Sequence, residues 1–204
     1  MFYSSSTTDM PSEPNEIDIF AATTRNDADI FFSRDDNNDP RLGEVLSRDE
    51  RLYDKARVVL LGCPQDEGVR RNRGRVGAAL APTEIRRSLY RLSPPVEKEV
   101  LFDLGDTQIR GTLEETHELQ LQIVRQLLRD GKRVIVLGGG NDISYPDCKA
   151  LATEAPGLLA FNIDAHLDAR ADAERNSGTP YRQLLEEGTL SCRTTSSKWD
   201  TSEQ

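Results

Sequence analysis

The amino-acid sequence predicts an α/β fold with three layers, in which helices cover both faces of a mainly parallel sheet. Four short apolar runs lack polar alternation, so they indicate strands that are buried on both faces. They occupy residues 58–62, 100–104, 134–137 and 158–163. Segments with helical features separate the runs, and strands that alternate with helices form parallel βαβ units. Glycine or acidic residues follow several runs, at the strand ends where such sheets bind ligands.

The helix expected at residues 112–130 has the clearest pattern. Apolar residues repeat every four positions on one of its faces, at Leu119, Ile123 and Leu127. Thr112 followed by Glu115 predicts a capping box at its start, because each side chain can bond the backbone N–H near the other residue. Further helices are expected at residues 82–92, through 149–151 and at 181–187.

Three segments of the chain differ in composition. Residues 57–190 carry the expected strands and helices and form the α/β domain. Residues 1–56 predict an N-terminal extension that is partly disordered, because residues 35–40 combine Asp, Asn and Pro, which favour turns. The apolar residues 30–32 are the part of this extension expected to pack onto the domain. Residues 191–204 are rich in Ser and Thr and predict a tail outside the domain.

Composition excludes several functional classes. The 204-residue chain has a formal net charge of -9 and a mean hydropathy of -0.59. This argues against binding to nucleic acid or membrane surfaces, which requires clustered Lys and Arg. No run approaches the roughly 20 apolar residues of a membrane helix, and no secretory signal is expected at the start. Cys63, Cys148 and Cys192 form no CxxC pair, which predicts free thiols and a cytoplasmic location.

Two carboxylates and an imidazole follow the fourth apolar run, at Asp164, His166 and Asp168. In an extended backbone alternate side chains point to the same side, so all three could converge on one point. Carboxylate and neutral imidazole suit a divalent cation such as Mn²⁺, and a carboxylate can bridge two cations. The alternative is a solvated loop, or a histidine that a neighbouring carboxylate orients.

The segment Asp164-Ala165-His166-Leu167-Asp168 resembles the ureohydrolase superfamily, which includes arginase, agmatinase and formimidoylglutamase. The resemblance implies that these residues are catalytic: Asp164 bridges two Mn²⁺ ions, His166 binds one ion and Asp168 the other. Gly138 to Asn141 matches the family's Gly-Gly-x-His element, which places Asn141 at a metal-ligand position. Further segments resemble the formimidoylglutamases, at residues 38–43, 66–72, 74–78, 168–170 and 177–182.

The resemblance also implies a reaction, the hydrolysis of a C–N bond in a linear amidine or guanidine. N-formimidoyl-L-glutamate would give L-glutamate and formamide, and a homo-oligomer is compatible with the family. Substrate carboxylates need cationic partners. Arg170 and Arg182 are the candidates, with Ser177 to orient substrate and Arg75 as a weaker choice. Arg170 could instead pair with a neighbouring aspartate, Ser177 could shape a turn, and the run from Arg70 to Arg75 could be a solvated face.

Two departures from the family pattern predict an incomplete metal site. Asn141 replaces a histidine ligand, and an amide oxygen is a weak, neutral ligand. The family's later Ser-x-Asp-x-Asp-x-x-Asp-Pro element has no counterpart, so the chain is expected to be truncated at its C-terminus. Catalytic metal sites usually have at least three protein ligands, so weak metal binding and impaired activity are expected. An open sheet edge is a second expected consequence.

Two other functions compete with this hypothesis. The first is a non-catalytic family member, or pseudoenzyme, that acts as a partner subunit. The second is a nucleotide-binding module, because Gly138 to Gly140 follow a strand and precede a helix. That pattern lacks the Gly-Lys-Ser/Thr ending of a phosphate-binding loop. His117 lies among Glu114, Glu115 and Glu118, and it is expected on the surface.

Overall fold

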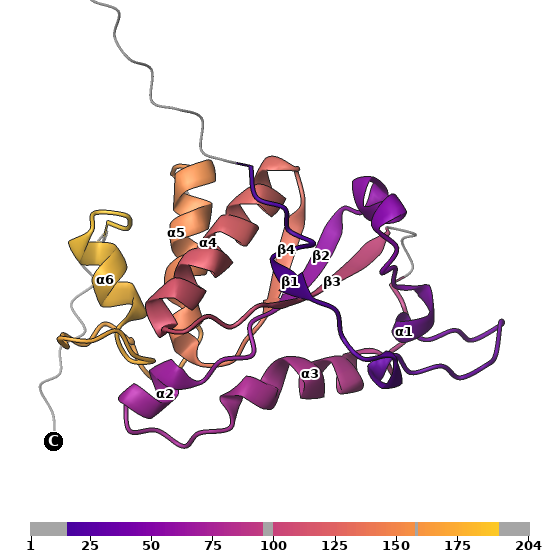
Figure 1. Ribbon diagram of the computed structural model, residues 1–204, viewed down its shortest axis with the longest axis horizontal. Coiled ribbons are helices and arrows are strands. Elements are labelled where there is room, and N and C mark those ends of the chain that lie inside the picture. Colours follow the sequence, from indigo (N-terminus) through magenta and orange to yellow (C-terminus); the bar gives the residue numbers. More distant parts are fainter. Residues whose placement is uncertain (1–15, 96–99, 158, 192–204) are drawn as a thin grey trace, which may run out of the picture.

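The computed structural model describes residues 16–95, 100–157 and 159–191. At its centre lies a four-stranded sheet with the order β1-β3-β2-β4 (Figure 1). The strands are β1 (Thr23–Thr24), β2 (Val58–Gly62), β3 (Leu101–Thr107) and β4 (Arg133–Leu137). β2 pairs in parallel with both β3 and β4, whereas the short β1 is antiparallel to β3. The prediction of a mainly parallel sheet is therefore confirmed.

Helices cover both faces of the sheet, as the three-layer prediction requires. α4 (Leu113–Arg129) and α5 (Ser144–Glu154) lie together on one face, and α3 (Ala81–Leu89) lies on the other (Figure 1). The remaining α-helices are α1 (Leu42–Val45), α2 (Glu67–Arg71) and α6 (Pro180–Glu186). Short 3-10 helices span Ala28–Ile30, Glu50–Lys55, Ala78–Leu80 and Asn141–Ile143. No helix of the described residues is long and apolar enough to cross a membrane.

Side-chain alternation along β2 lets one strand support two apolar clusters. Val59 and Leu61 are fully buried on the face that α4 covers, where they pack in one cluster with Phe102. Leu60 belongs to a second cluster on the opposite face, together with Tyr90 at the end of α3. Successive side chains of a strand point to opposite faces, so a strand covered on both faces must be apolar throughout. The uninterrupted apolar run of the sequence is explained by this double burial.

The helix predicted at residues 112–130 is present as α4, and its capping box is confirmed. The Thr112 hydroxyl accepts the Glu115 N–H at 3.1 Å, and the Glu115 carboxylate accepts the Thr112 N–H at 3.0 Å. A cap of this type stabilises a helix by about 1 kcal/mol. The surface position expected for His117 is wrong, because this residue is only 1% exposed. It lies on the face of α4 that is buried within the protein, while its glutamate neighbours lie on other faces.

Residues 16–56 contribute to the sheet and to both apolar clusters. They supply β1 to the sheet, and Ile19 and Tyr53 are buried in the same cluster as β2. Ile30 is also buried, and Phe31 stacks on Tyr90 with 5.0 Å between ring centroids. The apolar cluster at residues 30–32 therefore packs onto the domain as expected. The other buried residues of this segment are single apolar residues between turns. Such residues leave no periodic pattern in a sequence. Residues 1–15 lie outside the described part of the chain.

Residues 159–163 do not form the strand that was expected at residues 158–163. Residue 158 lies outside the described part of the chain. Leu159, Phe161 and Ile163 are 75%, 82% and 98% exposed. A strand requires a neighbour for its backbone hydrogen bonds, and β4 ends the sheet on this side without another described strand beside it. Ile135 of β4 is 48% exposed, as the expectation of an open sheet edge requires. Residues 192–204 of the expected tail also lie outside the described part.

A buried ionic cluster ties α3 to β3. The Arg86 guanidinium donates two hydrogen bonds of 3.0 Å to the Asp103 carboxylate and one of 2.5 Å to Asp106. The Tyr90 hydroxyl donates a short hydrogen bond to Asp103. The side chains of Arg86 and Asp103 are both 0% exposed. Burial raises the pKa of Asp106, and the adjacent Arg86 opposes this effect. The cluster is fully paired as it stands, so loss of its one cation would leave two acids uncompensated.

Arg86→Met is expected to lower the free energy of unfolding by roughly 3–5 kcal/mol, because it leaves the buried Asp103 without its cation. Urea unfolding followed by circular dichroism measures this loss. Arg87→Met is the matched control on the same helix, because the Arg87 side chain is 49% exposed and its ion pairs are at the surface. The control is expected to change stability by less than about 0.5 kcal/mol. Equal losses in the two variants would contradict a structural role for the buried cluster.

Candidate functional site

Three loops meet at the edge of the sheet where β2 and β4 end. The first leads from β2 into α2, the second is the glycine turn (residues 138–143), and the third is the Ser-Gly loop (residues 170–179). The Gly140 N–H donates to the Gln65 carbonyl at 2.9 Å, which joins the first loop to the second. The Ser177 N–H donates to the carbonyl of Gly68, in the first turn of α2, at 3.0 Å, which joins α2 to the third loop. The site is therefore assembled on backbone contacts between distant parts of the sequence.

The glycines of the glycine turn are required by close packing. A Cβ atom on Gly139 would lie 2.0 Å from the carbonyl oxygen of Gln65, and one on Gly140 would lie 2.3 Å from the Asp142 carboxylate. Both distances are shorter than any non-bonded contact, so a side chain at Gly139 would separate the loops and one at Gly140 would displace Asp142. This packing accounts for the Gly-rich sequence that also raised the nucleotide-binding alternative.

Asn141 connects the glycine turn to Asp168. The Asn141 side-chain N–H donates to the Asp168 carboxylate at 2.5 Å, and the Ser144 hydroxyl donates to the Asn141 amide oxygen at 3.1 Å. Asp168 has a φ of 47°, in the left-handed region, which turns the chain sharply. Partial burial and the nearby charge of Asp164 raise the pKa of Asp168. The two predicted metal-site residues are thus in direct contact, with the amide N–H directed at the carboxylate.

Asp164 and His166 lie close together but do not converge with Asp168. The Asp164 carboxylate accepts the His166 backbone N–H at 2.8 Å and lies 3.3 Å from its Nδ1 atom. The His166 side chain is 82% exposed. The chain bends at residues 164–166 and again at Asp168, so the extended geometry that would align the three side chains is not present. In the described part of the chain, no three His, Cys, Asp or Glu side chains are grouped to hold a metal ion. The donors suit Mn²⁺ in type but not in arrangement.

Arg170 is held by amide side chains. Its guanidinium donates a short hydrogen bond to the Asn72 amide oxygen and one of 3.3 Å to Asn176. Asn72 in turn donates to the Ser177 hydroxyl at 2.9 Å. Arg170, Asn72, His166 and Asp168 border one open cavity of about 530 Å³. The structure therefore places two predicted metal ligands, His166 and Asp168, and one predicted substrate residue, Arg170, around one cavity, although the two ligands do not converge on one point.

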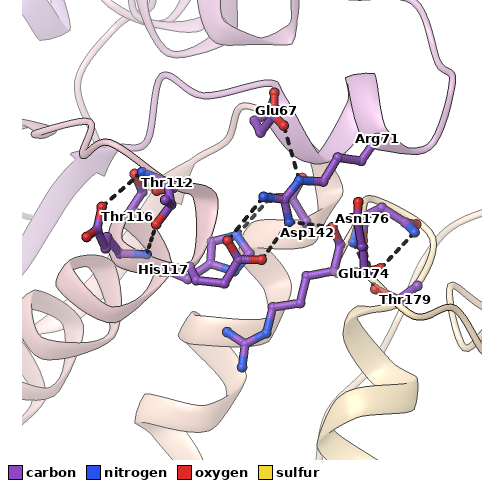
Figure 2. A network of polar contacts seen from close by, with 12 residues as sticks. Glu67, Arg71, Thr112, Thr116, His117, Asp142, Glu174, Asn176 and Thr179 are labelled. Carbon is purple, nitrogen blue, oxygen red and sulfur yellow. Dashed lines mark hydrogen bonds and ion pairs between the residues drawn. The ribbon is translucent and has the colours of Figure 1, made fainter.

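The other predicted cations lie apart from this cavity. Arg182 donates to Glu186 at 2.5 Å along the exposed side of α6, and Arg75 is exposed. Arg71 differs from the solvated face expected for its run. It contacts Glu67 (Figure 2), the Glu114 carboxylate at 2.5 Å and the backbone carbonyl of Arg175 at 3.2 Å. Arg71 therefore joins α2 and the start of α4 to the Ser-Gly loop.

Two asparagines of the site were missed from the sequence. Asn176 shapes the Ser-Gly loop, because its amide oxygen accepts the Gly178 N–H at 3.0 Å and its amide N–H donates to Asp172 at 2.9 Å. The Asn-Ser-Gly sequence is a turn signal and could have identified Asn176. Asn72 carried no comparable local signal, because its partners Arg170 and Ser177 are about a hundred positions further along the chain.

Asp147 is a further acidic residue near this edge of the sheet. It lies on α5 and accepts a hydrogen bond of 2.9 Å from Gln120 of α4. Burial between the helices raises the pKa of Asp147 to about 7. Burial also raises the pKa of the nearby Cys63 thiol, and the charges of Asp147, Asp142 and Asp106 add to this effect. The buried region beneath the site therefore contains more acidic side chains than cationic ones.

Comparisons with known proteins place these features in a family context. Residues 56–196 match the arginase family. The formimidoylglutamase of Klebsiella pneumoniae subsp. pneumoniae is 36% identical over 167 residues, which are 77% of this chain and 52% of that protein. This chain thus spans about half the length of the curated relatives it matches.

Solved structures give the same picture. A Trypanosoma cruzi formiminoglutamase, an asparagine-to-histidine variant with Mn²⁺, has a TM-score of 0.69 and 38% identity; the match covers 76% of this chain and 55% of that chain. The formimidoylglutamase of Bacillus subtilis subsp. subtilis has a TM-score of 0.70 and 29% identity over 78% of this chain and 52% of that chain.

The raised pKa of Asp147 predicts a pH-dependent stability. The folded state holds this proton up to about pH 7, whereas the unfolded carboxyl loses it near its ordinary pKa of 3.8. Between these limits the folded state binds more protons, so stability falls as the pH rises. Part of the residue reaches solvent, which screens the charge, so we expect a loss of roughly 1–2 kcal/mol.

Asp147→Asn tests this account, because the amide keeps the shape and does not titrate. Urea unfolding of both proteins at pH 5 and pH 8 is expected to show a smaller fall in stability for the variant. The same fall in both proteins would mean that other groups cause it.

Proposed function

The chain belongs to the arginase family, and from this premise we propose that it carries part of the active site of an amidine hydrolase of the formimidoylglutamase type. Such an enzyme would convert N-formimidoyl-L-glutamate and water to L-glutamate and formamide. The observation that supports the proposal best is the single cavity bordered by His166, Asp168 and Arg170. It combines groups that suit a metal with a cation that suits a carboxylate.

Arg170 is the strongest candidate for substrate binding. A guanidinium can bind a carboxylate through two parallel hydrogen bonds, and this substrate has two carboxylates. Asn72 and Asn176 engage the Nη2 atom and restrict the side chain, which lowers the entropy lost when substrate binds. Ser177 remains a proposed contact beside it. Arg182 is the weaker candidate, because its Nε atom already pairs with Glu186.

For the metals, we propose Mn²⁺ with Asp164, His166 and Asp168 as protein ligands and Asn141 as a weak fourth. These donors are of the right chemical type. They are not gathered in the structure, so we derive no catalytic step through a metal. The Asn141 N–H already binds an oxygen of Asp168 that a cation would need. Impaired metal binding in this chain therefore forms part of the proposal.

The second candidate is a non-catalytic relative that binds a partner subunit. The observation that favours it is the same Asn141–Asp168 hydrogen bond, which satisfies both side chains without any cation. Both candidate functions involve the same region of the protein, around Asn141 and Asp168.

Cys63 and Cys148 are free thiols, which is the expected state in the cytoplasm.

Asn141→His is expected to raise Mn²⁺ affinity at least about tenfold, because it replaces an amide with an imidazole ligand and frees Asp168. Isothermal titration and metal content per chain after dialysis measure the affinity. Leu92→His is the matched control, because it adds an exposed histidine beside α1, away from the glycine turn. Formamide release from N-formimidoyl-L-glutamate, measured on the same samples, is expected only where Mn²⁺ is bound.

Two results would count against the proposal. Equal Mn²⁺ affinities in the wild-type, Asn141→His and Leu92→His proteins would remove residue 141 from the metal site. When Asp168→Asn is added to Asn141→His, we expect the gain in Mn²⁺ affinity to be lost. Persistence of the gain in that double variant would mean that the new histidine binds metal elsewhere.

A further inference from the structure

Beneath the glycine turn, the Asp142 carboxylate is buried and held by residues from separate elements. Asp142 is 1% exposed, and so is His117 of α4. The His117 Nε2 atom lies 2.8 Å from an Asp142 carboxylate oxygen, and the Gln65 side-chain amide donates to the same oxygen at 2.5 Å (Figure 2 shows His117 against Asp142). We name these three residues the buttress.

The second oxygen of Asp142 is enclosed by backbone. Cβ atoms built on Gly68 and Gly140 would lie 2.1 Å and 2.3 Å from this oxygen, so only glycine fits on either side. Within the described residues this oxygen has no hydrogen-bond partner, and neither do the His117 Nδ1 atom and the Gln65 side-chain oxygen. A buried polar atom without a partner costs about 1–3 kcal/mol. Apolar replacement of a buried polar group of this kind is often neutral or stabilising, so stability alone does not account for the buttress.

The buttress touches both halves of the candidate site. On one side, Asp142 directly follows Asn141, the residue that contacts Asp168. On the other side, Asp142 packs against Gly68, whose carbonyl accepts the Ser177 N–H at 3.0 Å. A displacement of the Asp142 carboxylate therefore alters the metal-type side and the Arg170 side together.

We propose that His117, Asp142 and Gln65 are positioning residues that set the distance between these two halves. The position of the loops depends on these contacts alone, whereas the consequence for metal and substrate binding rests on the proposed function. His117 lies on α4, which packs on the sheet. The buttress therefore connects the loops to the core of the protein.

His117→Phe is the main test, because it keeps the buried volume and removes the contact with Asp142. Backbone amide exchange by NMR is the readout, with the amides of Gly140 and Ser177 as reporters, since each donates across a loop junction. The Cys63 amide, which donates to Leu137 at the sheet edge, is the internal reference. We expect exchange at Gly140 and Ser177 to accelerate at least about tenfold relative to Cys63.

A matched core variant separates positioning from general destabilisation. Val124→Ala on α4 removes buried apolar volume in the sheet-side cluster that contains neither His117 nor Asp142. It is expected to accelerate all three amides to a similar degree. His117→Gln, which keeps an amide N–H for Asp142, is expected to restore part of the protection, and it serves as the test if His117→Phe does not fold.

Unchanged Ser177 exchange relative to Cys63 in both His117 variants would overturn the proposal, and so would a uniform acceleration like that of Val124→Ala. Mn²⁺ titration of the same samples is a separate arm. Absence of Mn²⁺ binding in every variant would count against the proposed function, while the exchange data would still decide the role of the buttress.

Discussion

The parallel pairing of β2 with a strand on each side is the constraint on which the rest of the structure depends. Because β2, β3 and β4 run in the same direction, all three end at one edge of the sheet. Their following loops must therefore meet there, whatever their sequences. The paired strand ends are also close to each other: a Cβ on Gly62 at the end of β2 would lie 1.9 Å from the carboxylate of Asp106 on β3. The site is a consequence of this shared edge, and its side chains then determine its chemistry.

Local sequence patterns predicted the elements that are determined by contacts within the segment or by burial on both faces of the sheet. The run at residues 58–62 and the capping box of α4 both met their expectation, because each pattern is imposed by its immediate surroundings. Residues 159–163 show the limit of such patterns. Their apolar composition favours a strand, but strand formation needs a hydrogen-bonding neighbour, and a neighbour is not a property of the segment itself.

The glycine turn was sought where a strand ends, and it does follow the end of β4. Asp168 was sought after the strand expected at residues 158–163, which residues 159–163 do not form, but its carboxylate still contacts Asn141. The supporting residues of the site depend on contacts across the chain. His117 is instructive, because a signal was present: Leu113, Gln120, Leu121 and Val124 lie three, four or seven positions away and are all buried. The acidic neighbours Glu114, Glu115 and Glu118 drew attention to the wrong faces of the helix. Asn72 carried no such signal.

The glycine turn separates two tasks between adjacent residues. Residues 141–143 form a single 3-10 turn, in which successive side chains point in different directions. Asn141 points toward Asp168, which borders the open cavity, whereas Asp142 points into the core against His117. An exchange at position 141 therefore changes the chemistry of the site and leaves the core packing intact. A chain of the arginase family can consequently keep its fold while an amide occupies this position, and the ligand set can vary independently of the scaffold that presents it.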